Sequence, residues 1–112
     1  MKVAVIGSRS MSEDLFDFML ENIPIGCSEI ISGGAEGADR LAERCAEKLS
    51  LPLLVFEPDY KKYGKSAPLQ RNCRIVEAAD YVLVFWDGKS KGTANTIITC
   101  LNTGKPIKII SV

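Results

Sequence analysis

Short apolar runs alternate with longer amphipathic or polar stretches along all 112 residues of the chain. The apolar runs are predicted strands at residues 3–6, 29–32, 53–56, 81–86 and 107–112. Because they are apolar on both faces and separated by helical stretches, they favour a parallel sheet that helices cover on each side. Right-handed crossovers then favour the strand order 3-2-1-4-5. The predicted fold class is a three-layer α/β/α domain with a five-stranded parallel sheet.

The spacing of apolar positions predicts helices at about residues 10–23, 38–49, 69–78 and 94–103. Ser10, with Glu13 three residues later, is the predicted N-terminal capping box of the first helix. Gly104 is the predicted C-terminal cap of the last helix. Residues 57 to about 68 form a predicted loop, which is long for a strand-to-helix connection and of the kind that often carries function.

The composition is that of one domain spanning residues 1–112, with room for a single core. Lys+Arg and Asp+Glu balance at 14 each, so any site for an anion must be local. The chain has no histidine, which removes the usual general base and the commonest metal ligand, and we predict no metal site. The four single cysteines favour reduced thiols in a cytoplasmic protein, and no apolar run reaches membrane-spanning length.

Three polar loops are expected at one edge of the sheet. Ligands of such sheets bind beyond the carboxyl ends of the strands where the winding reverses, here between strands 1 and 4. The loops that reach this edge are Gly7-Ser8-Arg9, Ser32–Asp39 (SGGAEGAD) and Asp87–Thr93 (DGKSKGT). Their small residues let backbone N–H groups approach an anion, and two of them lead into helix N-termini. One such loop is often only a turn, but three at one crevice favour a ligand that contains phosphate.

The sequence lacks both the dinucleotide fingerprint and the Walker A motif. Arg71-Asn72, at the start of the third predicted helix, either points into the crevice to bind phosphate or is a solvated helix pair. The basic and aromatic residues at 60–65 would suit a nucleotide, but a solvated loop is the favoured interpretation. Trp86 either stacks on a ligand or, as we prefer, closes the edge of the core.

Gly7-Ser8-Arg9, Ser32–Asp39, Arg71-Asn72 and the Gly92-Thr93 step, in this order, resemble the SLOG superfamily. This superfamily links the DNA-processing protein DprA (Smf) with the LOG cytokinin-activating phosphoribohydrolases. The similarity spans essentially the whole chain and is greatest to the short YspA-like members. The resemblance implies a Rossmann-like fold that binds nucleotides or nucleotide-derived ligands.

Two branches of this superfamily imply different activities. In the LOG branch, a Gly-Gly-x-Gly-Thr-x-Glu-Glu motif supplies carboxylate for cleaving the N-glycosidic bond of a nucleoside monophosphate. Asn95 and Thr96 stand here in place of the glutamates, and neither can act as a carboxylate base. Arg71 still matches the family arginine, so phosphate binding without this chemistry is implied. The DprA branch binds single-stranded DNA, but the neutral chain lacks the excess positive charge on which such binding depends.

The predicted function is binding of a phosphate-bearing nucleotide, or a derivative such as ADP-ribose, as a sensor or carrier. The predicted ligand-binding residues are Gly7, Ser8, Arg9, Ser32, Gly33, Gly34, Gly37, Arg71, Asn72, Asp87, Gly88, Gly92 and Thr93. The glycines of the second loop are expected to hold phosphate, with charge from the two arginines and hydroxyl contacts from the two serines.

The alternative function is a nucleotide N-glycosidase or another nucleotide hydrolase that uses Asp87, Asp39 or Glu36 in place of the missing glutamates. Asp39 is otherwise expected to stabilise the start of its own helix. Single-stranded DNA binding is the third hypothesis. The only cofactor considered is a Mg²⁺ ion accompanying the ligand phosphates. A homodimer is implied through the LOG-like relatives, and no membrane partner is expected.

Overall fold

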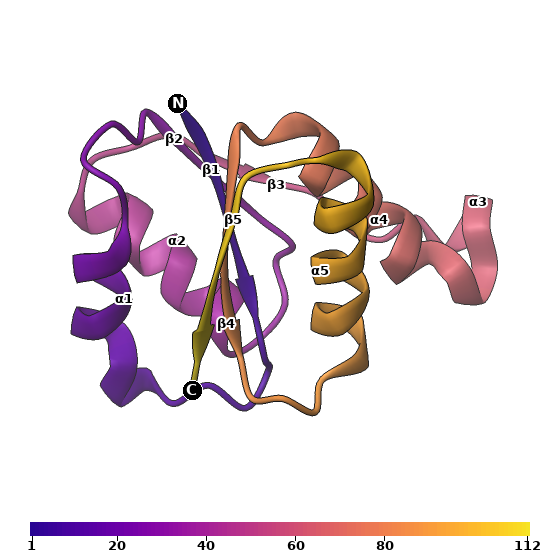
Figure 1. The fold of residues 1–112 in the computed structure, drawn as a ribbon, viewed down its shortest axis with the longest axis horizontal. Coiled ribbons are helices and arrows are strands. Elements are labelled where there is room, and N and C mark those ends of the chain that lie inside the picture. The colour runs from indigo at the N-terminus through magenta and orange to yellow at the C-terminus, as the bar shows by residue number, and fades with distance from the viewer.

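Five parallel strands form one sheet in the order β3-β2-β1-β4-β5 in the computed structural model, which describes residues 1–112 (Figure 1). The strands are β1 (Lys2–Gly7), β2 (Glu29–Ser32), β3 (Leu53–Val55), β4 (Tyr81–Trp86) and β5 (Ile107–Ser111). Val3 pairs with Ile30 of β2 on one side and with Tyr81 of β4 on the other. The winding therefore reverses between β1 and β4, and the predicted fold class is confirmed.

Helices cover both faces of the sheet. Two of them, α1 (Phe16–Asn22) and α2 (Ala38–Lys48), pack on one face, and α4 (Ala67–Ala78) and α5 (Lys91–Thr103) pack on the other (Figure 1). Each face buries its own apolar cluster, of 13 residues under α1 and α2 and of 10 residues under α4 and α5. Strands enclosed in this way keep the loops at their carboxyl ends in fixed positions.

The predicted capping box at Ser10 is wrong. Ser12 is the residue that caps, because its Oγ accepts a hydrogen bond from the N–H of Asp14 at 3.3 Å, at the start of a 3-10 turn (Glu13–Leu15) that leads into α1. Ser10 instead donates its hydroxyl to Asp87 Oδ2 at 3.2 Å. A carboxylate from a loop 77 residues away in sequence competes for this hydroxyl, and no local pattern indicates that.

Part of the predicted loop at residues 57–68 is helical. A single turn, α3 (Tyr60–Tyr63), is capped by the carboxylate of Asp59 and runs into a 3-10 turn (Gly64–Ser66). The following helix α4 begins at Ala67 rather than at Leu69, with Pro68 in its first turn, where a missing N–H breaks no helical hydrogen bond. This segment projects from the side of the domain (Figure 1).

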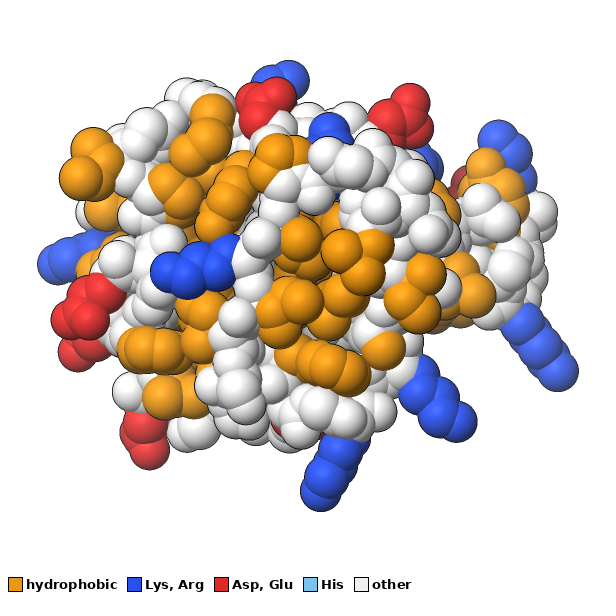
Figure 2. Space-filling view, viewed as in Figure 1, with side chains coloured by type: hydrophobic (Ala, Val, Ile, Leu, Met, Phe, Trp, Pro, Cys, Tyr) orange, Lys and Arg blue, Asp and Glu red, His pale blue; other side chains and the backbone are white.

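Hydrophobic side chains gather on the face formed by β5 and α5 (Figure 2). The most exposed of them here are Ile98 and Leu101 of α5 and Ile109 of β5. None of these three lines the cavity described below. None of the helices has both the length and the apolar character that crossing a membrane requires.

Candidate functional site

A polar cavity of about 410 Å³ opens at the carboxyl ends of β1, β2 and β4. Its wall is built by the loops that follow these three strands and by α4 and α5. Its volume lies within the range of ordinary small-molecule pockets. The cavity is therefore where the reversal of winding predicts a ligand site.

The cavity brings together most of the predicted ligand-binding residues. Those in its wall are Gly7, Arg9, Gly33, Arg71, Asn72, Asp87, Gly92 and Thr93, and Asp39, a candidate catalytic residue, lies there as well. Those outside its wall are Ser8, Ser32, Gly34, Gly37 and Gly88. Glu36, a candidate catalytic residue, lies with Arg9 and Arg40 in a separate hollow of about 340 Å³. Three residues that were not predicted as ligand contacts also line the cavity: Ser10 follows the first loop, Ser90 lies within the third loop, and Thr96 lies in α5.

Three N–H groups of the glycine-rich loop after β2 and of the start of α2 are bound within the protein. The N–H of Gly34 donates to Ser32 Oγ at 3.2 Å, and the N–H of Ala35 donates to Asp39 Oδ2 at 3.1 Å. The N–H of Ala38, at the start of α2, donates to the carbonyl of Ser8 at 3.2 Å. Of the three glycines predicted to hold phosphate, Gly34 therefore has its N–H occupied within the protein, whereas the N–H groups of Gly33 and Gly37 have no partner within the chain.

Gly37 is required for close packing. Its φ is +69° and its ψ is −120°, a conformation that is essentially restricted to glycine. A Cβ atom here would lie 2.4 Å from the carbonyl oxygen of Arg9. The glycine lets α2 begin directly against the loop after β1, which explains it without any ligand.

The buried hydroxyls of Ser8 and Ser32 hydrogen-bond to backbone groups of Asp87 and Asp39, two residues that line the cavity. Ser8 is 1% exposed, and its Oγ accepts the N–H of Asp87 at 3.0 Å while its carbonyl accepts the N–H groups of Met11 and Ala38. Ser32 is fully buried, and its hydroxyl donates to the carbonyl of Asp39. Both hydroxyls hold the loops together and neither residue lines the cavity, so their contact with a ligand stays a prediction.

Arg71 is buried rather than solvated, with 9% of its surface exposed. Its Nη1 donates to the carbonyl of Gly33 at 2.7 Å and to that of Phe56 at 3.4 Å, and its Nε donates to Asn72 Oδ1 at 2.8 Å. Burial lowers the pKa of this guanidinium, and the neighbouring carboxylate of Asp39 opposes that shift. The remaining nitrogen, Nη2, has no hydrogen-bond partner within the chain.

Asp39 reaches the same cavity from the first turn of α2 and is 7% exposed. Desolvation raises its pKa, against the lowering effects of the Ala35 hydrogen bond and of Arg71. By accepting the N–H of Ala35 with Oδ2, this carboxylate stabilises the turn that leads into its own helix. Its other oxygen, Oδ1, has no partner within the chain.

The loop after β4 is arranged differently from the loop after β2. Asp87 Oδ1 accepts the N–H groups of Lys89 and Ser90 at 2.8 and 2.9 Å, and these bonds lower the pKa of Asp87 to about 2. Ser90 is the N-cap residue of α5, but its side chain accepts no backbone N–H of the helix. The N–H groups of the first three helical residues, Lys91 to Thr93, consequently have no partner within the chain.

Asn95 and Thr96, which replace the LOG glutamates, lie in different surroundings. Thr96 lines the cavity, and its hydroxyl donates to the carbonyl of Gly92 at 3.2 Å. Asn95 is outside the cavity wall, with its Oδ1 buried and without a hydrogen-bond partner. Neither residue places a carboxylate in the cavity.

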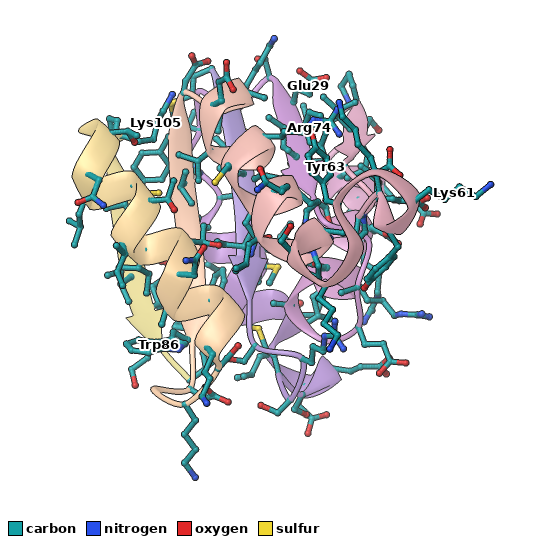
Figure 3. All side chains as sticks on the ribbon, turned by 90° about the vertical axis from the view of Figure 1, so that its right-hand side faces the viewer. Glu29, Lys61, Tyr63, Arg74, Trp86 and Lys105 are labelled. Carbon is teal, nitrogen blue, oxygen red and sulfur yellow. The ribbon has the colours of Figure 1, made fainter.

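The aromatic and basic residues near the site contribute support or are solvated. Trp86 lies at the end of β4 beside the first turn of α5, where its Nε1 donates to the carbonyl of Ser90 at 3.0 Å (Figure 3). It packs against the apolar cluster under α4 and α5, which confirms the preferred interpretation that it closes the core edge. Lys61 points away from the domain into solvent (Figure 3). No group of three or more cysteine or acidic residues is placed to hold a metal ion.

The fold and the cavity define a parallel, Rossmann-like α/β protein with a polar site where the winding of the sheet reverses. No family model matches the chain, and no solved structure matches it. The chain is 31% identical over 117 residues to the Gene 61 protein of Mycobacterium phage D29, in an alignment that covers 95% of this chain and 93% of that protein. The chain belongs to the family of this phage protein.

Proposed function

We propose that this protein binds a nucleotide or nucleotide derivative and that the N-terminus of α5 receives its phosphate. The observation that carries the proposal is the set of three partnerless N–H groups at Lys91–Thr93, where α5 meets the cavity. A helix N-terminus favours negative charge, and unpaired N–H groups are the donors that a phosphate oxygen accepts.

The surroundings of α5 leave room for such a group. A Cβ atom at Gly92 would meet no atom within 4 Å, so the second residue of the helix borders open space. Arg9, exposed and without an ion pair, lines the cavity from the loop after β1. A nucleotide phosphate would therefore have backbone donors and a free cation within one small volume.

Binding without turnover, as in a sensor or carrier, is the form of this function that we favour. The positions that match the LOG glutamates carry an amide and a hydroxyl, and no carboxylate in the cavity takes their place on α5. The resemblance to the SLOG superfamily implies the same class of ligand.

A proline substitution tests the role of α5 directly. Gly92→Pro removes one of the three free N–H groups, and proline is tolerated in a first helical turn, as Pro68 is in α4. Gly92→Ala is the matched control, because it adds a Cβ into open space and keeps the N–H. We expect calorimetric titration with AMP, ADP-ribose and NAD to identify a ligand, and Gly92→Pro to weaken its binding about tenfold relative to Gly92→Ala.

The outcome separates binding from folding. If both variants melt within a few degrees of the parent and bind the nucleotide equally, α5 does not receive the phosphate. If none of the nucleotides binds the parent protein, the proposed function itself is wrong.

A nucleotide hydrolase is the second candidate, because two carboxylates of the cavity differ in their proton affinity. Burial raises the pKa of Asp39, while backbone hydrogen bonds lower that of Asp87 to about 2. Such separation is what a general acid and an ionised partner need. Chromatography of each nucleotide after incubation with the protein tests this function. Release of free base that Asp87→Asn abolishes would establish the enzyme, and intact nucleotide would exclude it.

A further inference from the structure

Asp39 and Arg71 are two buried residues of opposite charge whose side chains both lie against Gly33. Each is more than nine-tenths buried, and they come from different helices, α2 and α4. A Cβ atom at Gly33 would lie 2.9 Å from Asp39 Oδ2 and 2.8 Å from Arg71 Nη1. The two side chains therefore fill the space that a side chain at residue 33 would need.

One end of each charged group is fixed and the other is free. Asp39 Oδ2 accepts the N–H of Ala35, and Arg71 Nη1 donates to the carbonyl of Gly33. Asp39 Oδ1 and Arg71 Nη2 have no hydrogen-bond partner within the chain. Neither atom is fully buried, because Asn95 Oδ1 is the single fully buried side-chain nitrogen or oxygen without a partner. The two free atoms are thus accessible, and both residues line the cavity.

A ligand group that both donates and accepts hydrogen bonds would satisfy both free atoms of this pair. A carboxylate oxygen only accepts and a guanidinium nitrogen only donates. An ionised phosphate offers acceptors alone and would be repelled by Asp39, so it does not suit this end of the cavity. Hydroxyl groups donate and accept, and in a nucleotide the sugar that carries them adjoins the phosphate.

We propose that Asp39 and Arg71 together bind the sugar hydroxyls of the ligand, so that the site selects ribonucleotides over deoxyribonucleotides. The inference rests on the proposed function, because the sugar is placed by a phosphate at the N-terminus of α5. The sugar then lies between α5 and the loop after β2, and Asp39 is a specificity-determining residue.

The test compares matched nucleotide pairs on the unmodified protein. Calorimetric titration is carried out with AMP, 2′-deoxy-AMP and 3′-deoxy-AMP, and with the corresponding CMP series. We expect removal of a hydroxyl to weaken binding about 10- to 100-fold, because a hydrogen bond to a buried charge is lost. Equal affinity of the ribonucleotides and both deoxy forms would overturn the inference while leaving the proposed function intact. Binding of none of these nucleotides would overturn both.

Asp39→Asn supplies a second, independent measurement. Its amide oxygen can still accept the N–H of Ala35, which leaves an N–H₂ donor facing the cavity where the free carboxylate oxygen was. We expect the ratio of ribonucleotide to deoxyribonucleotide affinity to fall towards one. Glu36→Gln, which removes a charge three residues away and outside the cavity, is the control and should keep the ratio of the parent. An unchanged ratio in Asp39→Asn would contradict the inference.

Discussion

The loops after β2 and β4 both carry glycine and polar residues at a strand-to-helix junction, yet their hydrogen-bond acceptors take up different N–H groups. In the loop after β2, the side chains of Ser32 and Asp39 and the carbonyl of Ser8 accept the N–H groups of residues 34, 35 and 38, including that of the first residue of α2. In the loop after β4, Asp87 binds the N–H groups of two turn residues and leaves the first turn of α5 free.

This difference shows that glycine content alone does not identify a site for an anion. Glycine permits the backbone to approach a ligand, but it equally permits the backbone to approach another part of the protein. What separates the two loops is which acceptors lie within reach of their N–H groups, and these acceptors come from distant parts of the chain.

The largest expected effect follows from exchanging one glycine in each loop for alanine. Gly37→Ala places a Cβ 2.4 Å from a carbonyl oxygen and forces a backbone conformation that only glycine adopts readily, so we expect a loss of about 4 kcal/mol in the free energy of unfolding. Gly88→Ala, at φ +79° with no atom within 4 Å, should lose about 1–2 kcal/mol. Thermal and urea denaturation measure both, and equal losses would remove the proposed contrast between a packed and an open loop.

A smaller loss in the free energy of unfolding is expected when the serine that hydrogen-bonds to each loop is replaced by alanine. Ser32→Ala leaves the N–H of Gly34 without its acceptor in a buried setting, which should lower the free energy of unfolding by about 1–3 kcal/mol. Ser10→Ala removes an exposed hydrogen bond to Asp87 and should cost about 0.5 kcal/mol. Urea denaturation distinguishes the two; a larger loss in Ser10→Ala would mean that the loop after β4 is the more tightly held.

The smallest effects concern the pH dependence of stability, where the carboxylates of the two loops should act with opposite sign. Asp87 has its pKa lowered to about 2 in the folded chain, so it stabilises the fold above its ordinary pKa of about 3.9, and this stabilisation is lost as pH falls towards 2. Asp39 has a raised pKa, so the folded chain binds its proton more readily than the unfolded chain does. Stability from this group therefore falls as pH rises from about 3.9 through the folded pKa.

Denaturation of Asp87→Asn and Asp39→Asn between pH 2 and 7 checks these signs. Relative to the parent, Asp87→Asn should lose stability at neutral pH and match it near pH 2. The free energy of unfolding of Asp39→Asn, relative to that of the parent, should be highest at neutral pH and lowest in acid. Parallel curves for the two variants would show that their environments do not differ as described.

The sequence predicted the sheet well because burial on both faces imposes apolar runs that can be read locally. All five strands were predicted within about a residue at either end of the observed elements β1 to β5. The reversal of winding between β1 and β4 followed from handedness, and with it the place of the cavity. The start of α4 was missed by two residues because Pro68 lies within its first turn.

The interior of the site was predicted less well, because its contacts join residues far apart in sequence. Arg71 bonds the carbonyl of Gly33 across 38 residues, and Ser8 bonds Asp87 across 79. Spacing could place these residues at one edge of the sheet, but not decide which donors would remain free. The N–H of Gly34 is bound to Ser32, and Gly37 is packed against the carbonyl of Arg9, and neither contact follows from the spacing of the glycines.

Ser8, beneath the cavity, ties three segments together: its hydroxyl accepts from the loop after β4, and its carbonyl accepts from α2 and from the N–H of Met11. A site braced in this way has its wall in place before a ligand arrives, and no segment has to order itself during the encounter. Little conformational entropy is then lost on association. We expect association rates in the ordinary range for a rigid pocket, with differences between ligands appearing in how long each one stays bound.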